Sequence, residues 1–319
     1  MRIKNDEEKV VLRLRGKLAD LLIKTAPEIY RKHITINGKD ETVLYVRALN
    51  SIYGIMKAAL LFYQKFVEDL MTIGFELNPY DPYVANNTIN GKQLTLVWHV
   101  DKIKASHVGA EVVTRIAKWL RKTYERLFRD GSGKMKLCRG KNYDYLGMNL
   151  DYTTKGEVKI TMIPYIKEMI QDFREHDPIP DKKSNTPAAE FLFKVDDESR
   201  LFDDSRAKVL HTFFAKALFT IKRSRPDIHI AVVFLTTCVQ GPNVDDWKKL
   251  LILIQYLRNT TEMPLTLRSD GTNIVKWWVD GSYAVHTDMR SQTGGTMSLG
   301  KGAIISTYIK QKMNTKSLT

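Results

Sequence analysis

The chain has 319 residues, of which 43% are hydrophobic, so it is long enough for about two domains, or one large domain with an appendage. Its formal charge of +14 favours an acidic partner, nucleic acid first, although lysine-rich helices can also serve solubility alone. Two cysteines, Cys138 and Cys238, exclude a disulfide framework and a cysteine-based zinc site. The sequence shows no membrane-length apolar run and no signal peptide, so we predict an intracellular protein, cytoplasmic or nuclear, with no membrane partner.

The N-terminal region predicts short strands and small helices. Val10 to Arg15 and Thr42 to Val46 are typical of strands, and Leu18 to Ile29 is typical of a short helix or turn broken at Pro27. A longer helix follows and ends at Gly74, because apolar residues recur there at three- and four-residue spacing. These apolar residues are Ile52, Ile55, Ala59, Phe62, Phe66 and Leu70, and Asn50 or Ser51 can cap the helix.

The stretch from Gln93 to Val108 predicts a β-hairpin. Leu94 to Val100 is apolar and rich in β-formers, and Asp101 and Lys102 interrupt it before a second apolar segment. A carboxylate held at the tip of a hairpin suits a ligand for a hard divalent cation. The same pattern is also typical of an ordinary surface hairpin, and the hairpin taken alone favours that interpretation, so residues elsewhere must decide.

An amphipathic helix is predicted after the hairpin. Its apolar side is formed by Val112, Val113, Ile116, Trp119, Leu120, Tyr124 and Leu127, and its other side by Lys118, Arg121, Lys122 and Arg126. Such a basic face either is only solvated or follows a phosphate backbone, and both interpretations stay open.

The middle of the chain predicts paired strands and then helices. Tyr145 to Leu150 and Val158 to Met162 are expected to pair around a turn at Lys155-Gly156, followed by a helix over residues 166–173. Asp177 to Pro187 is typical of a linker. Three further helices are then predicted: residues 205–223, a second to about Val239 after a break at 225–228, and a third starting near Asp245.

The last part changes to a strand period. Ile274 to Val279, Thr296 to Leu299 and Ala303 to Ile309 predict three strands separated by glycine-containing turns.

Short motifs in this order resemble the reverse transcriptase and ribonuclease H region of copia-type retrotransposon Gag-Pol polyproteins, over almost the whole chain. The motifs are Ile52-Tyr53-Gly54-Ile55, His99-Val100-Asp101-Lys102, Tyr145-Leu146-Gly147-Met148, Arg225-Pro226-Asp227-Ile228, Trp277-Trp278-Val279-Asp280 and Arg290-Ser291-Gln292-Thr293-Gly294-Gly295. The resemblance implies an α+β chain in three regions. Residues 1–176 would be a partial polymerase palm, a helix-on-antiparallel-sheet unit. Residues 177–268 would be a helical thumb or connection, and residues 269–319 the three-stranded opening of a ribonuclease H-like domain.

The resemblance also implies which residues act. Asp101 and Asp280 would be catalytic residues that bind Mg²⁺ or Mn²⁺, and Tyr53, Gly54 and Lys57 would contribute to the nucleotide pocket. Together with the basic helix face at Lys118, Arg121 and Lys122, they would engage an RNA or DNA template-primer duplex.

Two departures from the family pattern bear on activity. The second hairpin aspartate of the family is Lys102 here, and the segment with the family's first catalytic aspartate does not precede Met1. We therefore expect a fragment truncated at both ends, with weak metal binding, no polymerase activity and possible self-association through unpaired sheet edges. The alternatives are a non-catalytic nucleic-acid-binding module and an unselected remnant of a polyprotein.

Overall fold

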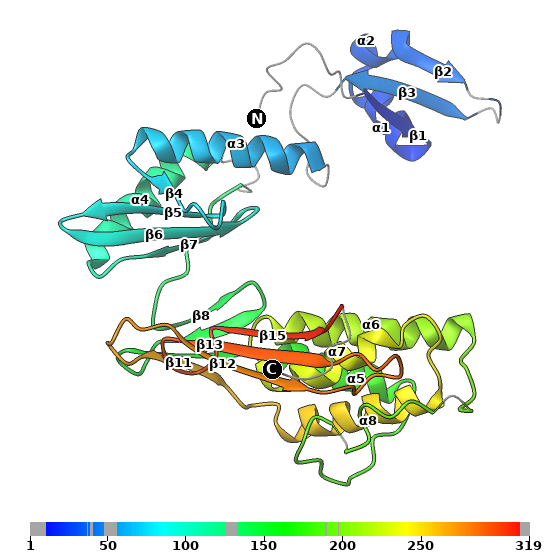
Figure 1. The fold of residues 1–319 in the computed structure, drawn as a ribbon. Helices are drawn as coiled ribbons and strands as arrows, with labels where there is room; N and C mark the ends of the chain where they lie inside the picture. Colours follow the sequence, from blue (N-terminus) through cyan, green and yellow to red (C-terminus); the bar gives the residue numbers. More distant parts are fainter. Residues whose placement is uncertain are drawn as a thin grey trace. The chain divides into compact units, whose positions relative to one another are not determined.

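The computed structural model describes residues 11–36, 38, 41–47, 56–125, 133–188, 190–196 and 198–312. It divides the chain into two compact units, Met1–Met135 and Lys136–Thr319, each built from helices and antiparallel sheets (Figure 1). The predicted mixture of helices and antiparallel strands is confirmed, whereas the palm and ribonuclease H assignments stay predictions. Within the described ranges, no helix is both long enough and apolar enough to cross a membrane.

The first sheet of the N-terminal unit has the order β1-β3-β2. Its strands are β1 (Val11–Arg15), β2 (Ile34–Ile36) and β3 (Thr42–Arg47), with α1 (Lys17–Thr25), α2 (Pro27–Tyr30) and a 3-10 turn (Arg31–His33) between the first two. The predicted break at Pro27 is confirmed, since Pro27 begins α2, where a missing N–H costs nothing.

The second sheet of this unit carries the predicted hairpin. Its order is β4-β5-β6-β7, with β4 (Glu76–Leu77), β5 (Val84–Ile89), β6 (Lys92–His99) and β7 (Lys102–Ser106), and it packs with α3 (Met56–Thr72) and α4 (Ala110–Tyr124). Because side chains alternate along a strand, Leu94, Leu96 and Trp98 share one face of β6, and all three are buried against both helices. The predicted cap and first residues of the long helix lie outside the described residues.

A five-stranded sheet opens the second unit, with the order β14-β11-β10-β9-β8. Its strands are β8 (Asn142–Tyr145), β9 (Met148–Asp151), β10 (Glu157–Thr161), β11 (Leu265–Ser269) and β14 (Gly300–Lys301). The predicted continuous strand from Tyr145 to Leu150 is wrong, because Leu146 and Gly147 form a two-residue hairpin loop between β8 and β9. Both residues have positive φ, 51° and 81°, which is the backbone that such tight hairpins require. The predicted pairing of β9 with β10 is confirmed.

This sheet joins segments that are far apart in the sequence. Residues 157–160 of β10 pair with residues 265–268 of β11, which in turn pairs with β14, so one sheet contains strands from all three predicted regions. The region boundaries at 176 and 268 stay predictions.

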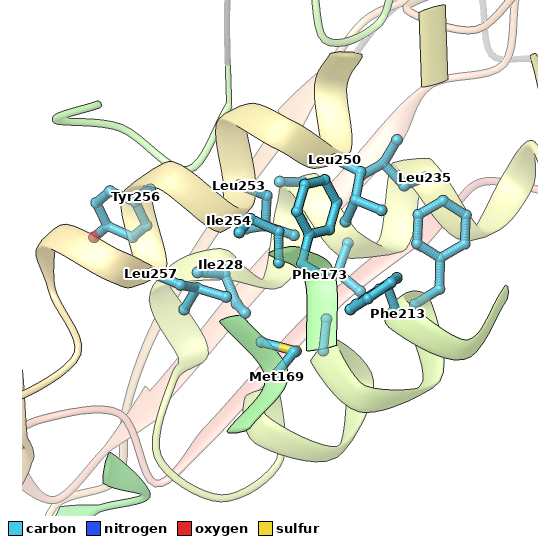
Figure 2. Packing of buried hydrophobic residues seen from close by; sticks show 14 of the residues in the cluster. Met169, Phe173, Phe213, Ile228, Leu235, Leu250, Leu253, Ile254, Tyr256 and Leu257 are labelled. Atoms are coloured by element: carbon cyan, nitrogen blue, oxygen red, sulfur yellow. The ribbon is translucent and has the colours of Figure 1, made fainter. Parts of the chain in front are cut away.

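Four helices form the main core of the second unit: α5 (Ile163–Arg174), α6 (Asp204–Ile221), α7 (His229–Thr237) and α8 (Val244–Asn259). Figure 2 shows Phe173 of α5, Phe213 of α6, Leu235 of α7 and Leu250 of α8 meeting in this core. Two helix starts have side-chain caps: the side chain of Asp203 accepts from Arg206 N at 2.8 Å, and Asn243 and Asp246 form a capping box. The helices predicted over this region are confirmed.

The predicted linker contains no helix or strand, but it is held against α8. The Arg258 guanidinium donates to the carbonyl of Pro180 at 2.8 Å, and Asn259 donates to the carbonyl of Ser184 at 3.3 Å. The segment over residues 177–187 is therefore part of the folded second unit and not a spacer between independent domains.

A second sheet of this unit has the order β12-β13-β15, from β12 (Lys276–Ser282), β13 (Gln292–Ser298) and β15 (Ile305–Lys310). The three predicted strands are confirmed, but β13 begins four residues earlier than predicted, so Gly294 and Gly295 lie inside it. A Cβ on Gly294 would lie 2.5 Å from the ring of Tyr308, so the absence of a side chain at Gly294 leaves space for this aromatic ring. Helix α7 packs on β15, where His229 Nδ1 lies 2.9 Å from Ser306 Oγ.

Candidate functional site

The tip of the β6-β7 hairpin is the first candidate site. His99 pairs with Lys102, so Val100 and Asp101 form a two-residue loop. The predicted turn at Asp101 is confirmed, whereas Lys102, predicted in the same break, begins β7. Val100 has a φ of 53°, a left-handed conformation that costs a β-branched residue about 1–2 kcal/mol. The paired strands thus hold Asp101 in a defined place at the end of the sheet.

The surroundings of Asp101 are open to solvent. Asp101 and Lys102 are both exposed, so solvent screens the repulsion between Lys102 and a cation bound at Asp101. In the part of the chain that the structure describes, no group of three or more His, Cys, Asp or Glu side chains is placed to hold a metal ion. Asp101 alone offers a monodentate or bidentate carboxylate to an ion that prefers several oxygen ligands.

An aromatic cluster lies between the β6-β7 hairpin and α3. The Trp98 ring packs edge-on against Phe66 of α3, with centroids 5.1 Å apart, and lies 6.2 Å from Tyr83. Tyr63 of α3 lies 5.3 Å from Tyr83. These contacts bury large aromatic surfaces between the helix and the strands, so they fix the hairpin relative to α3.

A hydrogen-bonded group joins α3 to the end of α4. Tyr124 Oη donates to Asp69 Oδ2 at 2.6 Å, and Lys65 pairs with the same carboxylate. Burial and the neighbouring Asp69 raise the pKa of Tyr124, so the phenol stays protonated. Burial alone would raise the pKa of Asp69, but the hydrogen bonds from Lys65 and Tyr124 outweigh it and lower that pKa below its ordinary value. The group therefore orients α4 and its exposed face.

The exposed face of α4 is the second candidate site. Val112, Ile116 and Leu120 are buried, whereas the predicted residues Lys118, Arg121 and Lys122 are exposed. Their separation on the two sides of the helix is as predicted.

Arg115 belongs to the same exposed face, and the sequence interpretation missed it. Its spacing of three and seven residues from Lys118 and Lys122 was the signal that could have identified it. Arg121 is partly engaged, since its Nε lies 3.7 Å from Glu125 Oε2. Within the described ranges, no acidic group lies within ion-pair distance of Arg115, Lys118 or Lys122. We call these four residues, Arg115, Lys118, Arg121 and Lys122, the basic face of α4.

The predicted nucleotide-pocket residues are not placed by the structure. Tyr53 and Gly54 lie outside the described residues, and so does the side chain of Lys57, whose backbone belongs to α3. Their role in a pocket stays a prediction.

Asp280 lies on β12 opposite Gly294 and is exposed. Its Oδ1 accepts from the N–H of Gly281 at 2.8 Å. Asp288, in the loop before β13, is exposed and pairs with Lys310 at 2.9 Å, and this hydrogen bond lowers the pKa of Asp288. The two aspartates are therefore not joined in a shared metal site within the described part of the chain.

The arginine-to-glycine motif, which leads into β13, has a structural role. Ser291 and Gln292 are buried, and Gln292 Oε1 lies 2.9 Å from Nε2 of the buried His286. His286 in turn stacks on Phe234 of α7, with ring centroids 5.9 Å apart. These contacts anchor the loop before β13 on the helical core.

The arginine-proline-aspartate-isoleucine motif is also structural. Arg225 is buried and donates from Nε and Nη2 to the Asp227 carboxylate at 2.9 and 2.7 Å. Its two Nη atoms also donate to the Thr260 carbonyl and hydroxyl at 3.1 and 2.7 Å, and Tyr256 donates to Asp227 at 2.9 Å. The motif thus ties the turn between α6 and α7 to the end of α8, where Figure 2 shows Ile228, Tyr256 and Leu257.

Comparison with known proteins relates the chain to a retrotransposon protein. No protein-family model matches the chain, and no solved structure matches it. A Saccharomyces cerevisiae protein named for transposon Ty5-1 is 22% identical over 262 residues, which cover 82% of this chain and 80% of the yeast protein. The chain is therefore distantly similar, over most of its length, to a retrotransposon protein, and this similarity indicates a retroelement origin.

Proposed function

We propose that the chain derives from the reverse transcriptase region of a copia-type retroelement and that it binds nucleic-acid backbones without transferring nucleotides. The distant similarity to the Ty5-1 protein supports the retroelement origin. The order of the polymerase-like and ribonuclease H-like motifs supports the reverse transcriptase region. The observation that carries the binding function is the basic face of α4.

The basic face has the properties of a phosphate-binding surface. Its four cations extend over about two turns of helix, roughly 10 Å at 1.5 Å per residue. The opposite side of α4 is locked into the core, and the bond from Tyr124 to Asp69 holds the helix end. Cations on a fixed helix bind phosphates with a smaller loss of conformational freedom than cations on a loop, and they carry no base specificity.

The hairpin supports the non-catalytic part of the proposal. Nucleotide transfer of the polymerase type relies on two metal ions and therefore on converging carboxylates. At the hairpin tip, a single exposed carboxylate, Asp101, is followed by a cation, Lys102. Asp280 belongs to a strand of the second unit and is exposed there.

We expect no template-dependent primer extension from the chain with Mg²⁺ or Mn²⁺. The variant Lys102→Asp should bind Mn²⁺ at least tenfold more tightly, because two unit charges about 4 Å apart in water interact by about 1 kcal/mol and the substitution reverses a charge beside a divalent ion. It should still not extend a primer, since a partial metal site is not a proportionally active one. The measurements are a Mn²⁺ titration and a primer-extension assay. Extension that disappears in Asp101→Ala would contradict the non-catalytic proposal.

Binding to a DNA duplex should depend steeply on salt. If the basic face neutralises four phosphates, log affinity should fall with log salt with a slope of about −3.6, at about −0.9 per phosphate. The triple variant Arg115→Gln, Lys118→Gln, Lys122→Gln should reduce the magnitude of this slope by about 2.7. Fluorescence anisotropy at several salt concentrations measures both values.

A matched control distinguishes the face from the overall charge. The variant Lys155→Gln, Lys182→Gln, Lys183→Gln removes the same charge from exposed positions of the second unit. It should leave the slope within about 0.5 of the original value. Equal losses in both triple variants would show that binding follows net charge, and the basic face would then not be the site.

A further inference from the structure

The outer edge of β12 is an apolar strand at the surface. Strand β12 ends the sheet order β12-β13-β15, and among the described strands only β13 pairs with it. Its three consecutive apolar residues Trp277, Trp278 and Val279 are exposed by 55%, 55% and 69%. Two further exposed apolar residues, Ile274 and Val275, precede the strand. Folded proteins usually shield such an edge with charges, prolines or bulges, because its N–H and C=O groups can accept another strand.

The sequence of β12 is complementary in charge to a second copy of itself. In an antiparallel pair centred on Trp278, Lys276 of each copy stands opposite Asp280 of the other. Residues 276, 278 and 280 share one face of the strand, so both charge pairs lie beside the central tryptophans. Opposite charges directly across an antiparallel pair stabilise it.

The apolar residues fit the same register. On the other face, Trp277 of each copy stands opposite Val279 of its neighbour, an aromatic and β-branched combination that favours cross-strand packing. A shift by two residues in either direction breaks both charge pairs: it places Lys276 opposite Trp278 or Ser282. The strand therefore selects one register for pairing with itself.

We propose that two copies of this chain associate through antiparallel pairing of their β12 strands, centred on Trp278. The pairing joins two three-stranded sheets into a continuous sheet with two-fold symmetry and covers the exposed tryptophans of both copies. In this arrangement Lys276, which already pairs with Asp270 of its own chain, lies between that carboxylate and Asp280 of the second copy. A two-fold interface of this kind closes on itself and limits association to a dimer.

The test measures the mass of the full chain by sedimentation at increasing concentration. The unmodified chain should show a monomer–dimer equilibrium. Asp280→Lys places lysine opposite lysine at both ends of the pair, and Lys276→Asp places aspartate opposite aspartate. Each variant alone should dimerise at least tenfold more weakly. Glu198→Lys, which makes the same charge change at an exposed loop position of the same unit, should dimerise like the unmodified chain.

The decisive measurement mixes the two variants. A strand with lysine at 276 and 280 is complementary to a strand with aspartate at both positions, so the mixture should recover dimers that neither variant forms alone. Misfolding of a variant cannot produce this recovery. A monomeric unmodified chain, unchanged dimerisation of Asp280→Lys, or a mixture of two folded variants that stays monomeric would each overturn the proposal.

Discussion

Replacing Arg225 with methionine is expected to lower the free energy of unfolding of the second unit by about 3 kcal/mol or more. The arginine side chain is 1% exposed, and it forms three hydrogen bonds to Asp227 and two to Thr260. Methionine fills a similar volume but leaves the Asp227 carboxylate and the Thr260 carbonyl without these donors. Removing one partner of a buried, hydrogen-bonded charge is costly for this reason.

Urea unfolding of the full chain, followed by tryptophan fluorescence, measures this loss. Arg225→Lys should retain only part of the stability, because an ammonium group cannot donate to Asp227 through a planar fork while it also reaches Thr260. Lys222→Met, three residues away and exposed, removes the same charge and should cost less than about 0.5 kcal/mol. If Arg225→Met costs no more than Lys222→Met, the motif does not hold α6, α7 and α8 together.

The second unit should also lose stability as the pH falls from about 6.5 to about 4. Burial, and to a smaller extent the nearby Lys222, lower the pKa of His229 from 6.5 to about 4. Between these values the unfolded chain binds a proton at His229 and the folded chain does not, so protons favour unfolding. Above pH 6.5 both forms are neutral and the contribution of His229 is complete; below pH 4 it is lost. The total effect is up to about 3 kcal/mol, at 1.36 kcal/mol per pH unit.

The variant His229→Gln isolates this effect from the carboxylates that titrate in the same range. Glutamine can replace the hydrogen bond to Ser306 without titrating, so its stability should depend less steeply on pH between 6.5 and 4. The difference between the two unfolding curves, measured at half-unit steps of pH, gives the contribution of His229. Parallel curves over this range would show that His229 does not titrate on unfolding.

Local pattern was sufficient for most elements of this fold. The periodicities of α3 to α8 follow from apolar spacing, and Pro27 and Gly74 mark the start of α2 and the end of α3. The caps at Asp203 and Asn243 were seen only in the structure. The β6-β7 hairpin follows from a polar break between two apolar segments. The strand predicted over Tyr145 to Leu150 is wrong. The loop at Leu146 and Gly147 depends on two positive φ angles, which the apolar pattern does not reveal.

The sequence predicted which residues form the candidate site, but it did not predict their solvent exposure or their contacts. The sequence located Asp101 at a hairpin tip and the basic residues on one side of a helix. It could not show that the tip is exposed, because exposure depends on which elements pack around each residue. The resemblance to copia-type proteins singled out Arg225 and Asp227, but only the contacts with Tyr256 and Thr260 show that they hold helices together.

By itself, then, the sequence determined the mixed α+β class, the helix and strand periods, the surplus of basic residues and the retroelement-like order of motifs. The tertiary structure decided what depends on partners distant along the chain. It paired residues 157–160 with 265–268, buried Arg225 against Thr260 and His229 against Ser306, and left β12 at a sheet edge. The physical reason is that helix periodicity reports which side of an element is apolar, whereas pairing and burial depend on the other elements that cover it.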